Sequence, residues 1–445
     1  MQDDELVLYT EHVEVLGRRW SDALTDTRFD AVVVPAGSAR NYLFDDQAPP
    51  FRPNPHLAQW FPVRHCEDAA MVIRPGQQPR LYLFQPNDYW HLVTEPPDWV
   101  GGALEILSFP DAHALGQALA RDVAADKRVA LIGEGDATNL PVAEINPTQL
   151  LARLDFQRAY KSGFEQACMR GANTRAATGH VAARDAFDAG ESEFGINLAY
   201  LRASAQTEAD LPYASIVALN EHAGVLHYQF YERNAPAARH SFLIDAGAAH
   251  FGYAADITRT YSAAYDDEFA ALVEALDAEQ QSLIAKLAPG INYLELHIDM
   301  HRRVAELLQR FDLVSCSAEA AFAQGITRTF LPHGLGHLLG LQTHDVAGQQ
   351  TSPDGGQNLP PVDYPSLRLT REIAPGMAFT IEPGLYFIPI ILRELRQTDA
   401  GGWVNWSKVD RLLPCGGIRI EDNVLMAADG GVENLTRDAF AQLRA

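Results

Sequence analysis

Acidic side chains interrupt four apolar, strand-forming runs in this chain. The four acids are Asp245 in SFLID, Asp256 in ADITRT, Glu382 in FTIEPG and Glu421 in GIRIED. A carboxylate in a buried strand needs a cation, a hydrogen-bond network or exposure to solvent, because burying a bare charge is costly. Any one of these acids alone is more often a turn residue, a helix cap or an ion-pair partner. Their recurrence in strands of the same half of the chain indicates a shared site.

The residues between these runs supply the nitrogen ligands that such a site would use. The stretch FLPHGLGHLLGLQTHDV, residues 330–346, carries His333, His337 and His344 among leucines and glycines. Four carboxylates converging without cations would repel one another and raise some of their pKa values. Two divalent ions would neutralise them, and four acids with one imidazole suit Mn, Co or Fe and also admit Zn. Two ions about 3.5–4 Å apart can share a bridging hydroxide and polarise a carbonyl.

The geometry of two of these runs can be predicted from their residues. In the last strand a period of two puts Arg419, Glu421 and Asn423 on one face, opposite the isoleucines. His333 and His337 have the spacing of a zinc-binding HExxH helix, but glycine follows His333 and further glycines disfavour a helix. We therefore expect the histidines to lie on an irregular segment.

The chain has 445 residues, which exceeds a typical single core, so two domains are expected. The first has the short apolar runs of a small α/β domain, at 29–34, 80–84 and 129–132, with a proline-rich irregular loop at 41–55. From about residue 160 the chain is alanine-rich and helical, and further helices are predicted at 272–287 and 296–311. The predicted domains are residues 1–158 and 159–445.

Composition excludes several classes of protein. With 47% hydrophobic and 21% charged residues, the chain is typical of a globular protein, and it has no apolar run long enough to span a membrane. Its acidic N-terminal residues differ from a signal peptide. The net charge of −23 argues against nucleic acid or an anionic membrane as partner. Four scattered cysteines without a CxxC pair fit a reducing cytoplasm.

The motifs together resemble a known family. Asp245, Asp256, His337, Glu382 and Glu421, with DAG, HGLGH, IEPG and GGIRIED around them, resemble the ligands of the pita-bread metallopeptidases in kind and order. PYASIVALNEHAGVLHY and FDDQAPPFRPNP resemble the branch of bacterial prolidases and organophosphorus acid anhydrolases. The resemblance covers essentially the whole chain. It implies an α/β (α+β) fold, with a small N-terminal α/β domain and a C-terminal pita-bread domain, in a homodimer.

The resemblance also implies a role for each ligand. Two divalent ions per subunit are expected, with manganese as the metal and cobalt or zinc as alternatives. Asp245 would bind one ion, His337 and Glu382 the other, and Asp256 and Glu421 both. Glu382 would also act as the general base.

Further residues match family positions that face the substrate. His227, His333 and His344 would hydrogen-bond the scissile carbonyl, the tetrahedral intermediate or the substrate carboxylate. Arginines read carboxylates well, and Arg368 and Arg419 would bind that of proline, with Arg371 as an alternative to Arg368. The remaining positions are Tyr213 and Thr343, which would line the pocket, and Asp46, which would reach the active site of the partner subunit. Alone, Tyr213 also reads as a core aromatic and Arg368 as a surface charge.

The activity implied is dinuclear metal-dependent hydrolysis of Xaa-Pro dipeptides by a bridging hydroxide, in a cytoplasmic enzyme. Three alternatives stay open: hydrolysis of organophosphorus triesters at the same site, cleavage of the aminopeptidase P type, and a non-catalytic pita-bread binding protein. A binding protein would be expected to have lost ligands, and all five are present.

Overall fold

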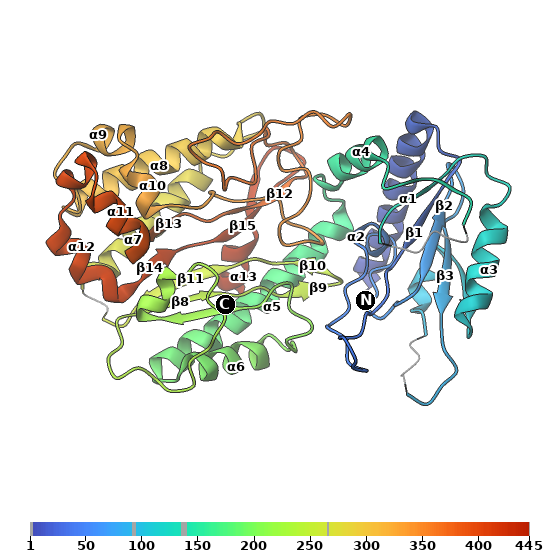
Figure 1. Cartoon of the computed structure of the whole chain (residues 1–445), viewed down its shortest axis with the longest axis horizontal. Coiled ribbons are helices and arrows are strands. Elements are labelled where there is room, and N and C mark those ends of the chain that lie inside the picture. The colour runs from blue at the N-terminus through green and yellow to red at the C-terminus, as the bar shows by residue number, and fades with distance from the viewer. Residues whose placement is uncertain (1–2, 91–94, 135–139, 265–266, 445) are drawn as a thin grey trace. The chain divides into compact units, whose positions relative to one another are not determined.

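A computed structural model describes residues 3–90, 95–134, 140–264 and 267–444. Its internal contacts divide the chain into two compact units (Figure 1). The first comprises Met1–Cys168 with Ser352–Gly356, and the second comprises Met169–Thr351 with Gln357–Ala445. The long helix α5 (Gly163–Asp188) begins in the first unit and continues into the second. The domain boundary predicted after residue 158 stays a prediction.

The first unit is built on a mixed sheet, with the strand order β4-β3-β2-β1-β5-β6 among the described residues. Its strands are β1 (Ala31–Pro35), β2 (Ala70–Ile73), β3 (Arg80–Phe84), β4 (Glu105–Phe109), β5 (Val129–Leu131) and β6 (Val142–Ile145). β1 runs antiparallel to β2 and parallel to β5, at the centre of the sheet. The predicted strands at 29–34, 80–84 and 129–132 are confirmed as β1, β3 and β5.

Helices cover both faces of this sheet because β1 is apolar on both sides. The helices of the unit are α1 (Asp3–Thr27), α2 (Pro55–Ala58), η1 (Asp98–Val100), α3 (Ala112–Val123) and α4 (Thr148–Arg158). Val32 and Val34 belong to the core that α1 and α4 close, whereas Val33 belongs to the core under α3. This arrangement is the one expected for a strand that reads as a continuous apolar run.

The second unit contains small antiparallel sheets, and the segments that carry the candidate acids are distributed among them. Its strands are β7 (Ile216–Leu219), β8 (Ser241–Asp245), β9 (Ala249–His250), β10 (Tyr253–Ala254), β11 (Thr258–Ser262), β12 (Ala378–Ile381), β13 (Gly384–Tyr386), β14 (Gly417–Arg419), β15 (Asp422–Met426) and β16 (Val432–Asn434). They pair as β11-β8-β7, β12-β15-β16, β13-β14 and β10-β9. The predicted pairing across residues 242–261 is confirmed, since β8 and β11 are antiparallel neighbours.

Helices of the second unit lie against these sheets (Figure 1). Buried aromatic and aliphatic side chains form the contact. They are α5, α6 (Glu193–Ala203), η2 (Asn220–Gly224), α7 (Glu268–Ile284), α8 (Tyr293–Arg310), α9 (Ala318–Ala323), α10 (Ile326–Phe330), α11 (Pro389–Arg396), η3 (Asp399–Trp403), α12 (Trp406–Leu412), η4 (Leu413–Cys415) and α13 (Leu435–Gln442). Phe187 of α5 and Tyr200 of α6 share a core with Phe242 of β8. The helices predicted from residues 160, 272 and 296 are confirmed as α5, α7 and α8.

Strand pairing brings the distant acidic segments together. Asp245 lies opposite Thr258 across β8 and β11, and Thr258 forms a further bridge with Glu421. Asp256 precedes β11 and Glu382 directly follows β12, so the prediction that placed these two acids within strands is wrong. The predicted last strand is divided into β14 and β15, and Glu421 lies between them. A carboxylate beside a strand end is free of the alternation that would force it onto an apolar face, which explains the difference.

No helix in the described part of the chain is long and apolar enough to cross a membrane.

Candidate metal centre

Three buried side chains of the second unit form a cluster suited to a metal ion. One ligand atom from each of Asp256, His337 and Glu421 lies within 4.8 Å of the others. Glu382 adjoins the cluster, since its Oε1 is 3.5 Å from His337 Nε2. Asp245 faces the same region through Arg419, which lies between it and Tyr386. The predicted ligand residues, scattered over the sequence, are thus neighbours in the fold.

The hydrogen bonds of His337 prepare one ring nitrogen as a ligand. Its Nδ1 lies 3.0 Å from the carbonyl oxygen of Leu338 and donates to it. Nε2 faces Asp256 Oδ2 at 3.4 Å and Glu382 Oε1 at 3.5 Å. The lone pair on Nε2 and the oxygens of the two carboxylates repel one another. A cation or a proton between them would remove this repulsion. The backbone bond at Nδ1 is the arrangement that orients metal-binding histidines.

Glycines let the segment around His337 approach its neighbours closely. A Cβ at position 336 would collide with the Tyr293 hydroxyl and the Thr380 carbonyl. His337 N also donates to Thr380 Oγ1, at 3.1 Å, and Leu338 forms a bridge with Phe379 of β12. Residues 331–346 contain no helix in the structure, as predicted. The glycines therefore fix the distance between His337 and the strand that leads to Glu382.

The acids perturb one another strongly. Burial and the neighbouring acids raise the pKa of Glu421 well above its ordinary value. Burial likewise raises the pKa of Glu382 to about 7 and raises that of Asp245. Burial also opposes ionisation of Asp256, but contact with His337 outweighs it and lowers the pKa of Asp256. The raised pKa values of Glu421, Glu382 and Asp245 are those of buried acids held together without enough positive charge.

Asp245 supplies a second indication that a cation fits here. Its Oδ2 accepts a hydrogen bond from Arg419, whereas its Oδ1 is buried and has no hydrogen-bond partner. A buried acceptor without a partner costs roughly 1–3 kcal/mol, and more when it is charged. The residues present therefore suit divalent ions, which would occupy such acceptors.

Arg419 is bound on several sides by the protein itself. It donates to Asp245 Oδ2 at 2.6 Å, to the Tyr386 hydroxyl at 2.8 Å and to Thr258 Oγ1 at 3.1 Å. Thr258 in turn donates to Glu421 Oε2 at 2.7 Å. The guanidinium thus neutralises part of the acidic cluster and orients Asp245, while its predicted contact with a substrate carboxylate stays a prediction.

The remaining predicted histidines gather around the cluster. His333 Nε2 lies 2.9 Å from the Tyr386 hydroxyl, and its Nδ1 is 3.8 Å from Glu382. The His344 ring meets the His337 ring edge to face, with centroids 4.4 Å apart. Burial, followed by the proximity of His337 and Arg368 and a smaller effect of His227, lowers the pKa of His344 to about 4. The electrostatic influence of His227 and Arg368 on His344 indicates that these side chains lie in the same region.

Arg368 and Arg371 differ clearly in the structure. Arg368 is exposed, whereas Arg371 is buried and donates to the Ala347 carbonyl at 3.3 Å. Arg368 contributes to the lowered pKa of His344. The geometry thus favours Arg368 as the arginine available to a ligand.

The other predicted pocket residues occupy different settings. The Tyr213 hydroxyl donates to Asp256 Oδ1 at 2.5 Å, so this side chain is more than a core aromatic. Thr343 has a buried hydroxyl without a hydrogen-bond partner. Asp46 is an exposed residue of the first unit, where its carboxylate accepts from Gln47. Two of these three residues therefore belong to the unit that holds the acids.

Sequence reasoning missed several residues that fix the ligands. Tyr386 and Thr258 connect Arg419 to the acids, as described above. Asn423 binds the backbone of Asp256 in both directions, accepting from its amide at 2.9 Å and donating to its carbonyl at 2.5 Å. The predicted alternation, which puts Asn423 on the same face as Glu421, is the sequence feature that could have indicated a role for Asn423 in the site.

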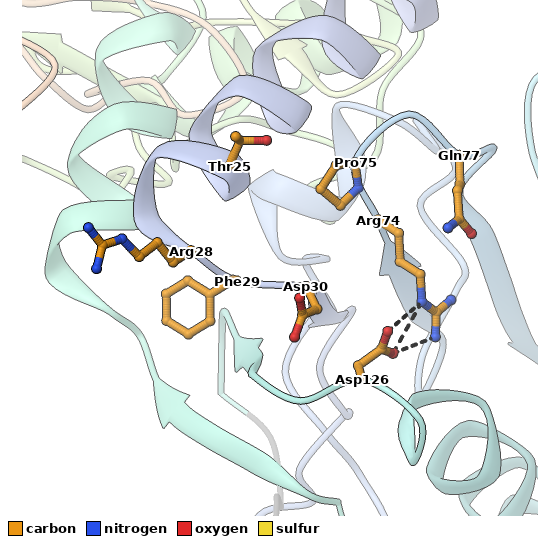
Figure 2. A pocket seen from close by; sticks show the side chains of 8 residues that line it. All are labelled: Thr25, Arg28, Phe29, Asp30, Arg74, Pro75, Gln77 and Asp126. Atoms are coloured by element: carbon orange, nitrogen blue, oxygen red, sulfur yellow. Dashed lines mark hydrogen bonds and ion pairs between the residues drawn. The ribbon is translucent and has the colours of Figure 1, made fainter.

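A surface hollow in the first unit contains none of the predicted site residues. It is lined by Thr25, Arg28, Phe29, Asp30, Arg74, Pro75, Gln77 and Asp126. Figure 2 shows that Arg74 points at Asp126, to which it donates from Nε and Nη2 at 3.1 and 2.8 Å. This positive charge is already paired, and the hollow carries no cluster of catalytic groups.

Comparison with known proteins identifies the family of both halves. Residues 167–428 match metallopeptidase family M24, and residues 7–156 match the N-terminal domain of Xaa-Pro dipeptidase. The chain is 45% identical over 437 residues to an Xaa-Pro dipeptidase of Xanthomonas axonopodis pv. citri, covering 98% of each chain. It is 44% identical over 444 residues to that of Stenotrophomonas maltophilia, covering 99% of each.

Solved structures support the same fold. The aminopeptidase PepP of Pseudomonas aeruginosa superposes with a TM-score of 0.73 at 22% identity, over 97% of this chain and 98% of that one. Aminopeptidase P of Escherichia coli gives 0.74 at 22% identity, over 98% and 99%. The predicted fold class, a small N-terminal α/β domain followed by a pita-bread domain, is thereby confirmed. The chain belongs to metallopeptidase family M24.

Proposed function

We propose that this protein is a metal-dependent dipeptidase that hydrolyses Xaa-Pro dipeptides, with proline at the carboxyl end. The observation that carries the proposal is the buried convergence of Asp256, His337 and Glu421, with Glu382 beside them. Relatives 45% identical over 98% of the chain, which are themselves named Xaa-Pro dipeptidase, support this substrate class.

Asp245, Asp256, His337, Glu382 and Glu421 would hold two divalent ions in the site, with manganese the expected metal and cobalt or zinc the alternatives. Two such ions would balance the charge of the four acids. Bound there, they would supply Lewis acidity toward the scissile carbonyl and make water nucleophilic near neutral pH. Arg419 and Tyr213 assist by orienting Asp245 and Asp256 respectively.

Glu382 is the proposed proton carrier. It lies 3.8 Å from His333 Nδ1 and 3.5 Å from His337 Nε2. Burial raises its pKa to about 7, which suits a group that both takes and returns a proton near neutral pH. In the proposed reaction Glu382 takes a proton from the attacking water and gives it to the leaving imino nitrogen of proline.

His227, His333 and His344 are proposed to bind the substrate. Burial lowers the pKa of His333 to about 3, and that of His344 to about 4, so both rings are neutral at pH 7. A neutral imidazole can donate one hydrogen bond to a carbonyl or carboxylate oxygen. In the neutral ring of His333, Nδ1 donates to the Gly334 carbonyl and Nε2 accepts from the Tyr386 hydroxyl, so its orientation is fixed before substrate arrives. Donation from His333 to the substrate would therefore replace its bond to Gly334.

The two ends of a dipeptide would be recognised by separate groups. Arg368, exposed and near His344, is proposed to bind the proline carboxylate, and Tyr213 and Thr343 to line the pocket beside it. Asp46 would contribute at the amino end from the partner subunit of a homodimer. The proposal places this homodimer in the cytoplasm, where neither nucleic acid nor membrane is a partner.

Turnover of Ala-Pro and Ala-Pro-Ala after exhaustive chelation, with Mn, Co or Zn then added back, tests the function. We expect metal-dependent cleavage of the dipeptide alone. Cleavage of the tripeptide at a comparable rate would contradict the proposal and favour activity of the aminopeptidase P type. A much higher rate on a fluorophosphate than on Ala-Pro would instead favour the organophosphorus alternative.

A further inference from the structure

Glu193, near the start of α6, is a buried acid that takes no part in the cluster described above. Glu193 is 1% exposed, and its two carboxylate oxygens accept hydrogen bonds from four donors. Oε1 accepts from the Leu219 amide at 2.8 Å and from His222 Nδ1 at 2.7 Å, while Oε2 accepts from the Tyr228 hydroxyl at 2.7 Å and from the Glu232 amide at 2.8 Å. A carboxylate with four such bonds is fully satisfied, and bonds to a charged acceptor are roughly twice as strong as neutral ones.

The four donors belong to one short segment. Leu219 ends β7, and residues 220–240 then connect β7 to its antiparallel neighbour β8. Leu219 and His222 lie where the segment leaves the sheet, and Tyr228 and Glu232 lie beyond its exposed bend. Glu193 therefore binds both sides of the bend at once.

The exposed bend carries His227. This residue is exposed and directly precedes Tyr228, which is buried at 6% exposure. The Tyr228 ring stacks on the His222 ring, with centroids 4.5 Å apart and planes 20° apart. Both stacked rings donate to Glu193, so the residue next to His227 is fixed by its ring and by its hydroxyl.

The backbone of the bend is also folded on itself. The Val225 amide donates to the His222 carbonyl at 2.9 Å, and the Tyr228 amide donates to the Val225 carbonyl at 3.1 Å. Two successive turns thus lead from His222, which Glu193 binds, to Tyr228, which it also binds. Little freedom is left for the backbone that presents the His227 ring.

A different side chain fixes the second half of the connection. Asn220 Oδ1 accepts from the His240 amide at 2.7 Å, and its Nδ2 donates to the Ala238 carbonyl at 2.8 Å. The return of the chain to β8 is therefore independent of Glu193. A change at Glu193 acts on the half that carries His227.

We propose that Glu193 is a positioning residue for His227, and that it sets where this imidazole meets the substrate although it does not touch the substrate itself. The inference rests on the proposed role of His227 in binding substrate. A misplacement of about 1 Å can cost a reaction up to about 100-fold, so loosening the bend is expected to reduce turnover nearly as much as removing the imidazole.

The test is a double-mutant cycle on Ala-Pro hydrolysis with Glu193→Gln, His227→Ala and the combined variant, each loaded with manganese. Glutamine keeps the shape of the side chain but offers an amide group to two of the donors. We expect each single variant to lower kcat/KM by about 10- to 100-fold with unchanged metal content. The combined variant should be no more than about threefold worse than His227→Ala, because both changes remove the same interaction.

A readout that is independent of activity accompanies the cycle. Amide hydrogen exchange at Leu219 and Glu232, whose N–H groups bind Glu193, should accelerate in Glu193→Gln. Tyr228→Phe removes one donor and keeps the ring, so it gives a smaller change of the same kind should Glu193→Gln not fold. Glu191→Gln, an exposed acid two residues away, is the matched control and should alter neither exchange nor kcat/KM.

The outcomes separate the two proposals. If His227→Ala lowers kcat/KM but the losses of the two single variants multiply in full, Glu193 acts elsewhere and only this inference is overturned. If His227→Ala leaves kcat/KM unchanged, the proposed role of His227 fails, and the positioning role falls with it.

Discussion

Arg419 and Asp245, 174 positions apart in the sequence, form an ion pair of 2.6 Å within the acidic cluster. The same guanidinium also donates to Tyr386 and Thr258, so its planar fork is matched to three acceptors. An ammonium cannot reproduce that geometry. The pair thereby links the orientation of one proposed ligand to a cation that the protein itself provides.

Arg419→Lys should therefore weaken metal binding. Loss of a group that orients a ligand typically costs about 10- to 100-fold in metal affinity, and we expect an effect in that range. Competition with a coloured chelator measures it. If Arg419→Lys instead raises KM for Ala-Pro while metal affinity is unchanged, Arg419 acts on the substrate and not on Asp245.

Asp256→Asn and Glu421→Gln should each lose both metal ions, because these residues are proposed to contact both. Elemental analysis of the purified variants gives the metal content per subunit. Removing the ions from the wild-type protein by chelation should abolish activity and lower its melting temperature, since the acids then repel one another and the stabilising ligand is gone. A fully active protein after exhaustive chelation would falsify the proposed centre.

The histidines should separate into two groups. His337→Ala should lose metal, because its Nε2 faces the acids. His344→Ala and His227→Ala should lower kcat by about 10-fold or more, a typical size for lost catalytic hydrogen bonding, and keep their metal. Equal metal loss in all three variants would show that the histidines are not divided as proposed.

Arg368→Ala should impair Ala-Pro hydrolysis far more than hydrolysis of an uncharged ester. Without the guanidinium the proline carboxylate has no bidentate partner, so KM should rise. Because Arg368 is exposed, the loss in kcat/KM should correspond to about 1 kcal/mol, the upper end for an exposed ion pair. Steady-state kinetics on both substrates provides the measurement. Arg393→Ala, an exposed arginine of α11, is the control and should behave like the wild type.

Acid should destabilise the second unit through His297. Burial lowers the pKa of His297 to about 4, below its ordinary value of 6.5, and neither ring nitrogen has a hydrogen-bond partner. The unfolded chain thus binds more protons below pH 6.5, and stability is lost as the pH falls from 6.5 toward 4. The loss approaches about 1.4 kcal/mol per pH unit.

Urea denaturation of the chelated protein at pH 7.5, 6.0 and 5.0 checks this. His297→Leu should lose less stability on acidification than the wild type, because leucine cannot take up a proton. His113→Leu, an exposed residue of α3, is the matched control. Parallel pH dependences in the wild type and His297→Leu would contradict the assignment.

The sequence predicted the elements of the site better than its connections. Alternation predicted Arg419, Glu421 and Asn423 on one polar face of a single strand, whereas the structure divides this stretch between β14 and β15, with Glu421 between them. Alternation could not show that Asn423 binds the backbone of Asp256, because the two are 167 positions apart and meet only through tertiary pairing. The choice between Arg368 and Arg371 likewise depended on burial, which similar local sequences do not reveal.

In the fold, too, local elements could be predicted from the sequence better than the exact ends set by tertiary pairing. β1, β3 and β5 could be located because buried strands of this kind are short and apolar throughout. The position of Asp256 before β11 could not, since the apolar pattern of the sequence continues past the end of the hydrogen-bonded ladder. Predictions from local periodicity thus succeed where a strand is buried along its whole length. They fail where the hydrogen-bonded strand ends before its apolar sequence pattern does.

The bridge between Thr258 and Glu421 has a consequence for how the protein is made. Contacts of such long sequence separation form slowly, because a large loop must close before they contribute. Asp245 and Asp256 are synthesised well before Glu421, and Asn423 itself depends on Thr436, whose hydroxyl accepts from its amide at 2.9 Å. A nascent chain therefore exposes an incomplete set of acids until β15 and α13 have docked. Metal binding at the proposed centre would accordingly follow completion of the fold, and truncation before α13 should yield a chain that stays metal-free.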